Sequence, residues 1–465
     1  MPSSKKPARS PKKSGKPSPK PKLPDQLQQV NLNAAGIDVG AATHFVAVPK
    51  GRDTEHVRQF AAFTTDLHRL ADWLAHCHIQ TVVMESTGVY WIPLFEILDA
   101  RGFAVQLVNA RHVKNVSGRK SDVLDCEWLQ QLHTFGLLQG AFRPPDQICA
   151  LRAFLRQRAT LVRYAAAHIQ HMQKALQQMN LLLHRVVSDL TGVTGLAIIR
   201  AILAGERDPL QLAQPRNPHC KQSAETIAQA LVGNFRPEHL FVLEQSLELY
   251  LAYQTKIQAC DQRIELLLAA FDAKTQTAPP PSTKRFPPRN QPSFDLRTAL
   301  FRMTGVDLSQ IDGIQPATAL TLISEIGADM TRWPSAKHFA SWLGLCPGTK
   351  ISGSKRLSSR TKPCANRAAA ALRLAAASLR HSQSALGAFH RRLTARLGKA
   401  QAVTATAHKL ARLVYSLLKN GHQFVDPGQQ AYEKAYQSRV LKNLSDRAHK
   451  LGFQLLPLPD PQPVT

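Results

Sequence analysis

The 465 residues include 59 lysines and arginines against 32 aspartates and glutamates, a formal net charge of +27, and 44% of them are hydrophobic. This composition is enough for two or three globular domains, and the charge indicates a polyanionic partner, nucleic acid rather than an anionic membrane. The sequence has no run of 18 uncharged apolar residues and no apolar segment of a secretory signal at its start, so we expect neither a membrane span nor secretion. Seven scattered cysteines without CxxC spacing are typical of reduced thiols in a cytoplasmic protein.

Residues 1–33 are predicted to form a disordered basic tail. The first 22 residues hold eight cations and no acid among prolines and serines, a composition that cannot bury enough apolar surface to fold. Two interpretations stay open, a nonspecific phosphate-binding arm and a solubilising extension.

Residues 34–145 alternate between predicted strands and helices. Strand patterns fall at 34–50 (a β-hairpin or a long strand pair), 58–63, 81–88 and 103–111. Helical spacing of apolar residues falls at 64–78, 89–102 and 121–136, with Ser121 as the predicted N-cap of the last helix. Three strands followed by alternating helices and strands indicate an α/β sheet domain.

Four acids stand at notable places in this domain. Asp38 lies within the first strand, Glu85 ends a central strand, and Asp122 and Asp125 share one helix face. Taken singly, Asp122 could be a favourable charge at a helix N-terminus and Glu85 the partner of an arginine. Taken together, converging carboxylates require divalent cations, and oxygen ligands suit Mg²⁺ or Mn²⁺. Two such metals about 4 Å apart can stabilise a phosphoryl transfer.

Several motifs carry a resemblance to a known family. GIDVG, MESTGVYW, LVNARHVKNVSGRKSDVLDCEWLQQLH and GLLQGAFRP resemble the RuvC-like (RNase H fold) domain of the DEDD transposases of bacterial insertion sequences, the Piv-type recombinases that work with a bridge RNA. The resemblance implies that Asp38, Glu85, Asp122 and Asp125 are the acidic tetrad and bind Mg²⁺ (or Mn²⁺). It also implies double-stranded DNA as substrate (element ends and target), a bridge RNA as partner, and a homodimer or tetramer.

Residues 146–276 are predicted to be long helices with two heptad seams. One seam runs from Leu155 to Leu183 and the other from Leu243 to Leu268. A helical hairpin packed on itself and a dimerisation coiled coil both fit this pattern, and the family resemblance favours the oligomer. The proline-rich residues 277–300 are predicted to be a linker.

Residues 301–425 are predicted to form a mainly helical C-terminal domain. Residues 306–327 resemble a helix-hairpin-helix, whose backbone N–H groups could bind a phosphate, although Gln315 replaces a common second glycine. An ordinary helix pair is the alternative. From Pro334 to Val425 there is no Asp or Glu but there are sixteen Lys and Arg, so this segment is expected to grip phosphates.

The segment GLCPGTKISGSKRLSSRTKPCANR is predicted to be a loop with four serines among six cations. Positive charge around a serine can stabilise its attack on a phosphodiester, whereas the alternative is that the serines are ordinary loop hydroxyls. FASWLGLCPGTKISGSKR resembles the C-terminal transposase domain of the family, which implies that Ser352 is the nucleophile, with Ser354 as the alternative. Residues 426–465 are predicted to be a peripheral tail.

These observations lead us to expect a DNA transposase or recombinase that forms a phosphoserine–DNA intermediate. A RuvC-like metal-dependent nuclease of the Holliday-junction type, using the acids alone, is the first alternative. A non-catalytic nucleic-acid-binding protein is the second.

Overall fold

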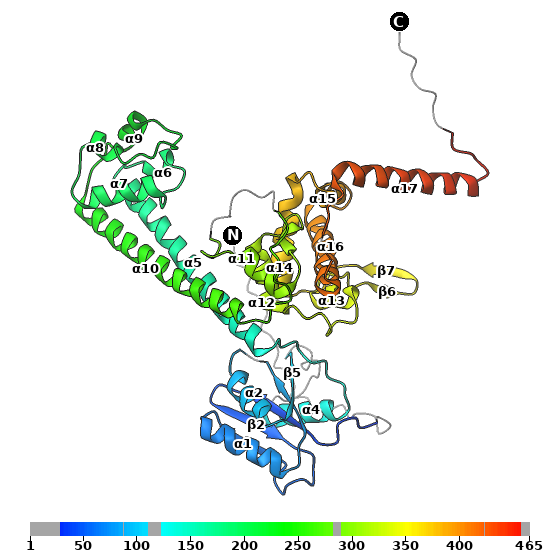
Figure 1. Ribbon diagram of the computed structural model, residues 1–465. Coiled ribbons are helices and arrows are strands. Elements are labelled where there is room, and N and C mark those ends of the chain that lie inside the picture. The colour runs from blue at the N-terminus through cyan, green and yellow to red at the C-terminus, as the bar shows by residue number, and fades with distance from the viewer. Residues whose placement is uncertain (1–27, 87, 110–121, 282–289, 423, 457–465) are drawn as a thin grey trace, which may run out of the picture. The chain divides into compact units, whose positions relative to one another are not determined.

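The computed structural model describes residues 28–86, 88–109, 122–281, 290–422 and 424–456 (Figure 1). The chain divides into two compact units, residues 1–143 and residues 144–465. Most of the predicted basic tail and the predicted helix cap Ser121 lie outside the described residues. Within the described residues, no helix is long and apolar enough to cross a membrane, and none of the seven cysteines forms a disulfide.

The first unit is built on a five-stranded mixed sheet. Its strands are β1 (Ala34–Val39), β2 (Thr43–Ala47), β3 (Val57–Ala61), β4 (Thr81–Glu85) and β5 (Ala104–Val108). The order across the sheet is β3-β2-β1-β4-β5, with β1, β2 and β3 antiparallel and β4 and β5 parallel to β1. The predicted α/β sheet is therefore confirmed.

Helices cover both faces of this sheet. Helices α1 (Thr64–His76) and α2 (Trp91–Ala100) share one hydrophobic core with the side chains of Ile37 and Met84. Helix α4 (Asp122–Thr134) packs on the opposite face. Helix α2 is the crossover between the parallel neighbours β4 and β5, which a tight turn cannot join because they run in the same direction.

Two long helices dominate the first part of the second unit. Helices α5 (Asp146–Gln178) and α10 (Pro237–Ala269) pack along each other, and four short helices occupy one end of the pair (Figure 1). These are α6 (Leu183–Val186), α7 (Val193–Leu203), α8 (Pro209–Ala213) and α9 (Ala224–Ala230). Seam residues such as Met172 and Leu247 share one core, so the helical hairpin accounts for both heptad patterns within a single chain.

The region after α10 contains a helix that starts earlier than predicted. Helix α11 (Leu296–Thr304) begins inside the range predicted to be linker, because the Asp295 carboxylate accepts a hydrogen bond of 3.1 Å from the Thr298 N–H and caps the helix. A short η1 (Leu308–Gln310) and α12 (Pro316–Ile326) follow.

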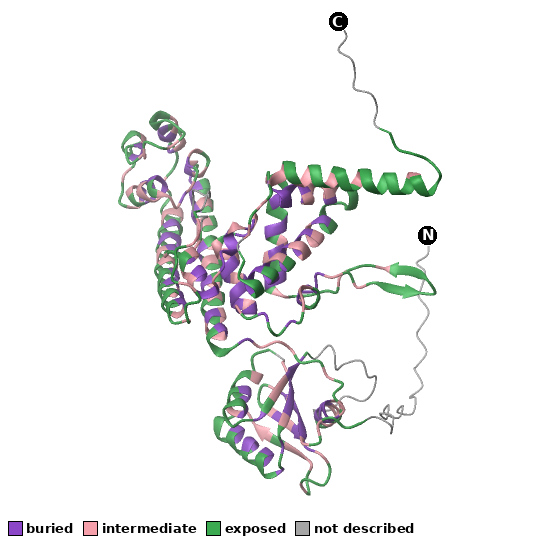
Figure 2. Cartoon of the chain, turned by 45° about the vertical axis from the view of Figure 1, so that its right-hand side comes forward, coloured by how far each residue is buried: buried purple, intermediate pink, exposed green. Residues whose placement is uncertain are grey.

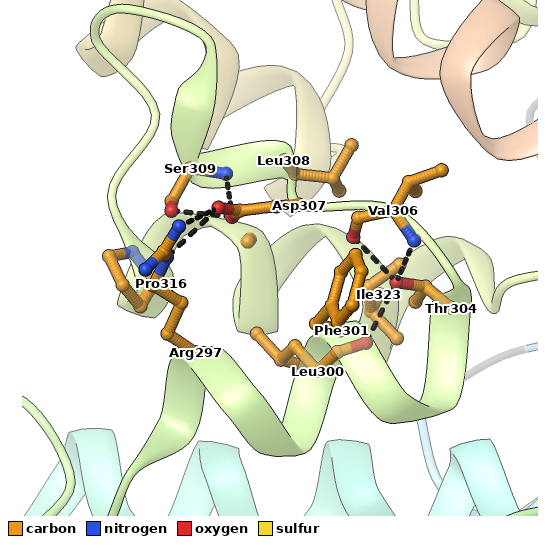
Figure 3. Close-up of a pocket in the computed structure, with 11 residues that line it drawn as sticks. Arg297, Leu300, Phe301, Thr304, Val306, Asp307, Leu308, Ser309, Pro316 and Ile323 are labelled. Carbon is orange, nitrogen blue, oxygen red and sulfur yellow. Dashed lines mark hydrogen bonds and ion pairs between the residues drawn. The ribbon is translucent and has the colours of Figure 1, made fainter. Parts of the chain in front are cut away.

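The turn region between α11 and α12 is held by its own side chains. Figure 3 shows Arg297 pointing at Asp307, whose carboxylate also accepts hydrogen bonds from the backbone and hydroxyl of Ser309. Gly313 has a φ of 85°, and a Cβ added there would lie 2.5 Å from the Ala375 carbonyl oxygen. The absence of a side chain at Gly313 therefore lets the backbone of Ala375 come close to it.

The rest of the second unit is mainly helical, as predicted. It contains α13 (Ala336–Trp342), β6 (Lys350–Ser352), β7 (Lys355–Ser358), α14 (Arg367–Ser378), η2 (Leu379–His381), α15 (Ala385–Leu397), α16 (Lys399–Asn420) and α17 (Gly428–Lys450). Helix α17 has no buried residue, and Figure 2 shows it mostly exposed, with some half-buried positions.

Candidate active site

The two strand acids meet at the carboxyl ends of neighbouring parallel strands. Strands β1 and β4 pair with Ala34 opposite Thr81 and Ile37 opposite Met84. The next step of this register sets Asp38 beside Glu85. Residues at matching positions of paired strands point to the same face, so both carboxylates stand on one side of the sheet.

That side is the face covered by α4. Ile37 and Met84 point to the α1 and α2 core, so their neighbours point the other way. Gln130 and Leu129 on α4 lie against this face. A Cβ added at Gly36 would lie 2.3 Å from the backbone nitrogen of Gln130, and Val83 packs against Leu129. Only glycine allows β1 and α4 to come so close, and this closeness positions α4 beside Asp38.

Helix α4 supplies the other two acids. Its buried residues Cys126 and Leu129 face the sheet. Asp122 stands four residues before Cys126, and the half-buried Asp125 stands four residues before Leu129, so each precedes a sheet-facing residue by one turn. The side chain of Asp122 lies outside the described part of the structure.

Electrostatics link Asp38 to this helix. Burial raises the pKa of the Cys126 thiol to about 12, and the negative charges of Glu127 and Asp38 add to the rise. The Asp38 carboxylate therefore acts electrostatically on the side of α4 that carries Cys126.

The carboxylate oxygens fit Mg²⁺ or Mn²⁺ in donor type. Among the described side chains, however, no group of three or more His, Cys, Asp or Glu is arranged to hold a metal ion. Asp38, Glu85 and Asp125 are all described, so these three acids alone do not form such a group, and the side chain of Asp122 lies outside the described part.

Ser352 lies on an exposed hairpin rather than in the predicted loop. Strands β6 and β7 pair with Ser352 opposite Lys355 and Ile351 opposite Arg356, and Figure 2 shows this hairpin as an exposed projection. Cross-strand pairing puts Lys355 on the same face as Ser352, while the register is irregular between Lys350 and Ile351. The sequence did not reveal this hairpin because the segment has no apolar alternation.

Ser354 has a different position in the same hairpin. Gly353 and Ser354 form the two-residue turn, with φ values of 46° and 55°. Positive φ at both central residues is the signature of a type I′ turn, which favours glycine. Ser354 is thus a turn residue whose backbone is in the left-handed region, whereas Ser352 lies in an ordinary strand.

Other side chains on or near the sheet face that α4 covers were not singled out from the sequence. Phe45 pairs with Asp38 across β1 and β2, and Gln59 pairs with Phe45 across β2 and β3. His56 lies 2.9 Å from Glu127, measured between Nε2 and Oε1. Strand register, which residue spacing does not give, would have been needed to find them.

Two comparisons with protein families match the chain. Residues 35–181 match the DEDD transposase model of the IS110 group, described as Transposase, and residues 307–391 match the model described as Transposase IS116/IS110/IS902 family. The first match contains all four acids and the second contains Ser352. A comparison with curated proteins finds no match.

Proposed function

Since the chain belongs to the IS110 family of DEDD transposases and is a DNA transposase, we propose that it cuts and rejoins DNA through a covalent bond between Ser352 and a DNA phosphate. The observation that carries this proposal is the placement of Asp38 beside Glu85 on the sheet face that packs against α4. The strand order and the mixed strand directions support an RNase H-like (RuvC-like) fold for the first unit.

The residues of the chain take distinct parts in this reaction. The Ser352 oxygen forms a bond to phosphorus while one bridging P–O bond of the DNA breaks. A carboxylate of the acidic set, from the same or another copy of the chain, takes the serine proton and passes a proton to the leaving oxygen, which becomes a DNA hydroxyl. A DNA hydroxyl later attacks the phosphoserine, which restores Ser352 and joins the strands.

Positive charge beside Ser352 supports its part. Lys355, which is paired with Ser352, and Lys350 on the same strand as Ser352 would hold the phosphate and offset the negative charge that develops on it. The fully exposed hairpin leaves Ser352 open to a large substrate. Position 354 lies in the turn and has a left-handed backbone, which glycine suits best. Glycine has no hydroxyl to react, so we favour Ser352 over Ser354 as the nucleophile.

Asp38, Glu85, Asp122 and Asp125 would hold Mg²⁺ or Mn²⁺. When bound, the metal supplies Lewis-acid stabilisation of the attacking and leaving oxygens. We further propose double-stranded DNA of the element ends and target as substrate, a bridge RNA as guide, and a homodimer or tetramer as the working form.

The acids provide the first test of this function. Asp38→Asn and Asp125→Asn should each abolish strand exchange in a plasmid recombination assay, while circular dichroism and nucleic-acid binding stay near those of the unchanged protein. Exchange at the unchanged rate in either variant would remove the acids from the reaction.

Sequencing of co-purified RNA tests the guide. A discrete structured RNA encoded beside the gene is the expected result, and random cellular RNA alone would contradict guidance.

Mixing Ser352→Ala subunits with Asp122→Asn subunits tests the oligomer, because activity returns only if acids and serine can come from different copies.

A further inference from the structure

An open groove of about 560 Å³ lies in the first unit between the edge strand β3 and the first turns of α4. Residues 55–60 line one side, and Val123 and Glu127 line the other. The reaction described above gives this groove no part.

The groove continues a row of side chains that starts at the acids. Glu85, Asp38, Phe45 and Gln59 stand at matching positions on β4, β1, β2 and β3, on the face that α4 covers. Neighbouring strands lie about 4.8 Å apart, so Gln59 is about 10 Å from Asp38 along this row. That span is roughly the reach from a phosphate to the base of an adjacent nucleotide.

The charges that line the groove already have partners. Glu127 is paired with His56 at 2.9 Å, and Arg58 is 3.1 Å from Asp53. The Arg58 guanidinium also lies 5.1 Å from the ring centre of Trp73 on α1, which is on the other face of the sheet. A second phosphate would therefore find little positive charge available among these lining residues.

The groups left for a ligand are a carboxamide and apolar surface. The Gln59 side chain is exposed and Val123 on α4 is 40% exposed, and both line the groove. The half-buried Phe45 is not among the lining residues but is paired with Gln59 on the next strand of the row. An amide offers a donor and an acceptor together, which is what the polar edge of a nucleobase requires, and an aromatic ring offers a stacking surface.

We propose that this groove holds a nucleobase of the DNA strand being cut, next to the phosphate that lies at the acids. The base rests on Val123, its polar edge bonds to the Gln59 amide, and it extends toward Phe45, the next side chain in the row. The base must be unpaired to present that edge, so the groove selects a strand opened at the cut. The inference rests on the proposed function, because a phosphate at the acids is what brings a base to this distance.

Abasic substrates test the groove once the covalent adduct has identified the cut phosphate. Duplexes of the element end would carry an abasic site at each nucleotide flanking that phosphate, and the full chain with its co-purified RNA would be used. The unchanged protein should form the adduct about tenfold more slowly when the base that fills the groove is missing.

Gln59→Ala should slow adduct formation on intact DNA by a similar factor and should add no further loss on that abasic substrate. Phe45→Leu, which keeps an apolar side chain in the sheet, should behave in the same way. Gln131→Ala, a change of an exposed glutamine on α4, should keep the full tenfold difference between substrates.

Gln59→Ala that slows intact and abasic substrates equally, or slows neither, would overturn the groove as a base site. Absence of any adduct in the unchanged protein would instead overturn the proposed function, so the two failures are distinguishable.

Discussion

Ser354 has a left-handed backbone, which costs a residue with a Cβ about 1 kcal/mol relative to glycine. Ser354→Gly should therefore stabilise the hairpin and leave adduct formation intact. Hydrogen exchange of the Lys355 amide, which bonds to the Gly353 oxygen at 2.6 Å, should slow by up to about tenfold. Loss of the adduct in Ser354→Gly would show that the turn serine, and not Ser352, is the nucleophile.

Among single residues, the sequence predicted which elements carry the acids but did not predict the strand pairing of Ser352. The elements that carry the four acids could be predicted because each acid stands beside a local apolar pattern that marks its strand or helix, whereas their role in a site stays a prediction. The pairing of Ser352 with Lys355 was not predictable, because it depends on a hairpin whose strands are almost entirely exposed and carry no apolar alternation.

Among the contacts between elements, we expect the one between β1 and α4 to be the most sensitive to a single added methyl group. Gly36→Ala would place a methyl group 2.3 Å from the Gln130 nitrogen, and neither backbone can yield easily. We expect a loss of about 1–3 kcal/mol of stability, measured by chemical denaturation, and a fall in activity as α4 moves from Asp38.

Gly140→Ala is the matched control for that change. The atom nearest to its added Cβ is the Gln106 Cγ at 3.3 Å, part of a flexible side chain that can move. An equal loss of stability in both variants would show that the β1–α4 contact has no special role.

The α5–α10 pair contains a buried ion pair between Arg158 and Asp261, with side chains 8% and 4% exposed. Arg158 also donates to the Asn290 carbonyl at 2.8 Å, and Asp261 accepts from the Ser293 N–H at 3.2 Å. Asp261→Leu alone should cost about 3–5 kcal/mol, because it leaves a guanidinium buried without its partner.

The double change Arg158→Met with Asp261→Leu should recover most of that loss, since no charge then stays buried. Denaturant titration of the single and double variants measures the difference. A double variant as unstable as Asp261→Leu would show that the bonds to Asn290 and Ser293 matter more than the charge.

At the scale of the whole molecule, the acid-free segment should make DNA affinity fall steeply with salt. The exposed Lys355 should release a counterion on binding, so Lys355→Met should reduce the slope of log affinity against log salt by about one. Lys409 stands 4.2 Å from the Phe389 ring centre, and burial lowers the pKa of its ammonium, so Lys409→Met should leave the slope unchanged. A flat response between about 50 and 200 mM salt would contradict phosphate binding by this segment.

The elements of the first unit could be predicted because each strand and helix shows its own apolar period. The heptad seams could not show whether each long helix pairs within its own chain or with a second chain, since the same leucines fit a helical hairpin and an intermolecular coiled coil. The start of α11 was missed because proline-rich sequence precedes it, while its cap, Asp295, is a single residue.

The central claim is that Ser352 becomes covalently bound to DNA, and trapping the reaction under denaturing conditions tests it directly. Trypsin cleavage after Lys350 and Lys355 gives a peptide, residues 351–355, that holds both Ser352 and Ser354. The Ser354→Gly variant leaves a single serine in that peptide. We predict a nucleotide mass on the peptide from Ser354→Gly and no adduct in Ser352→Ala. An adduct that persists in Ser352→Ala, or that maps to another peptide, would contradict the account.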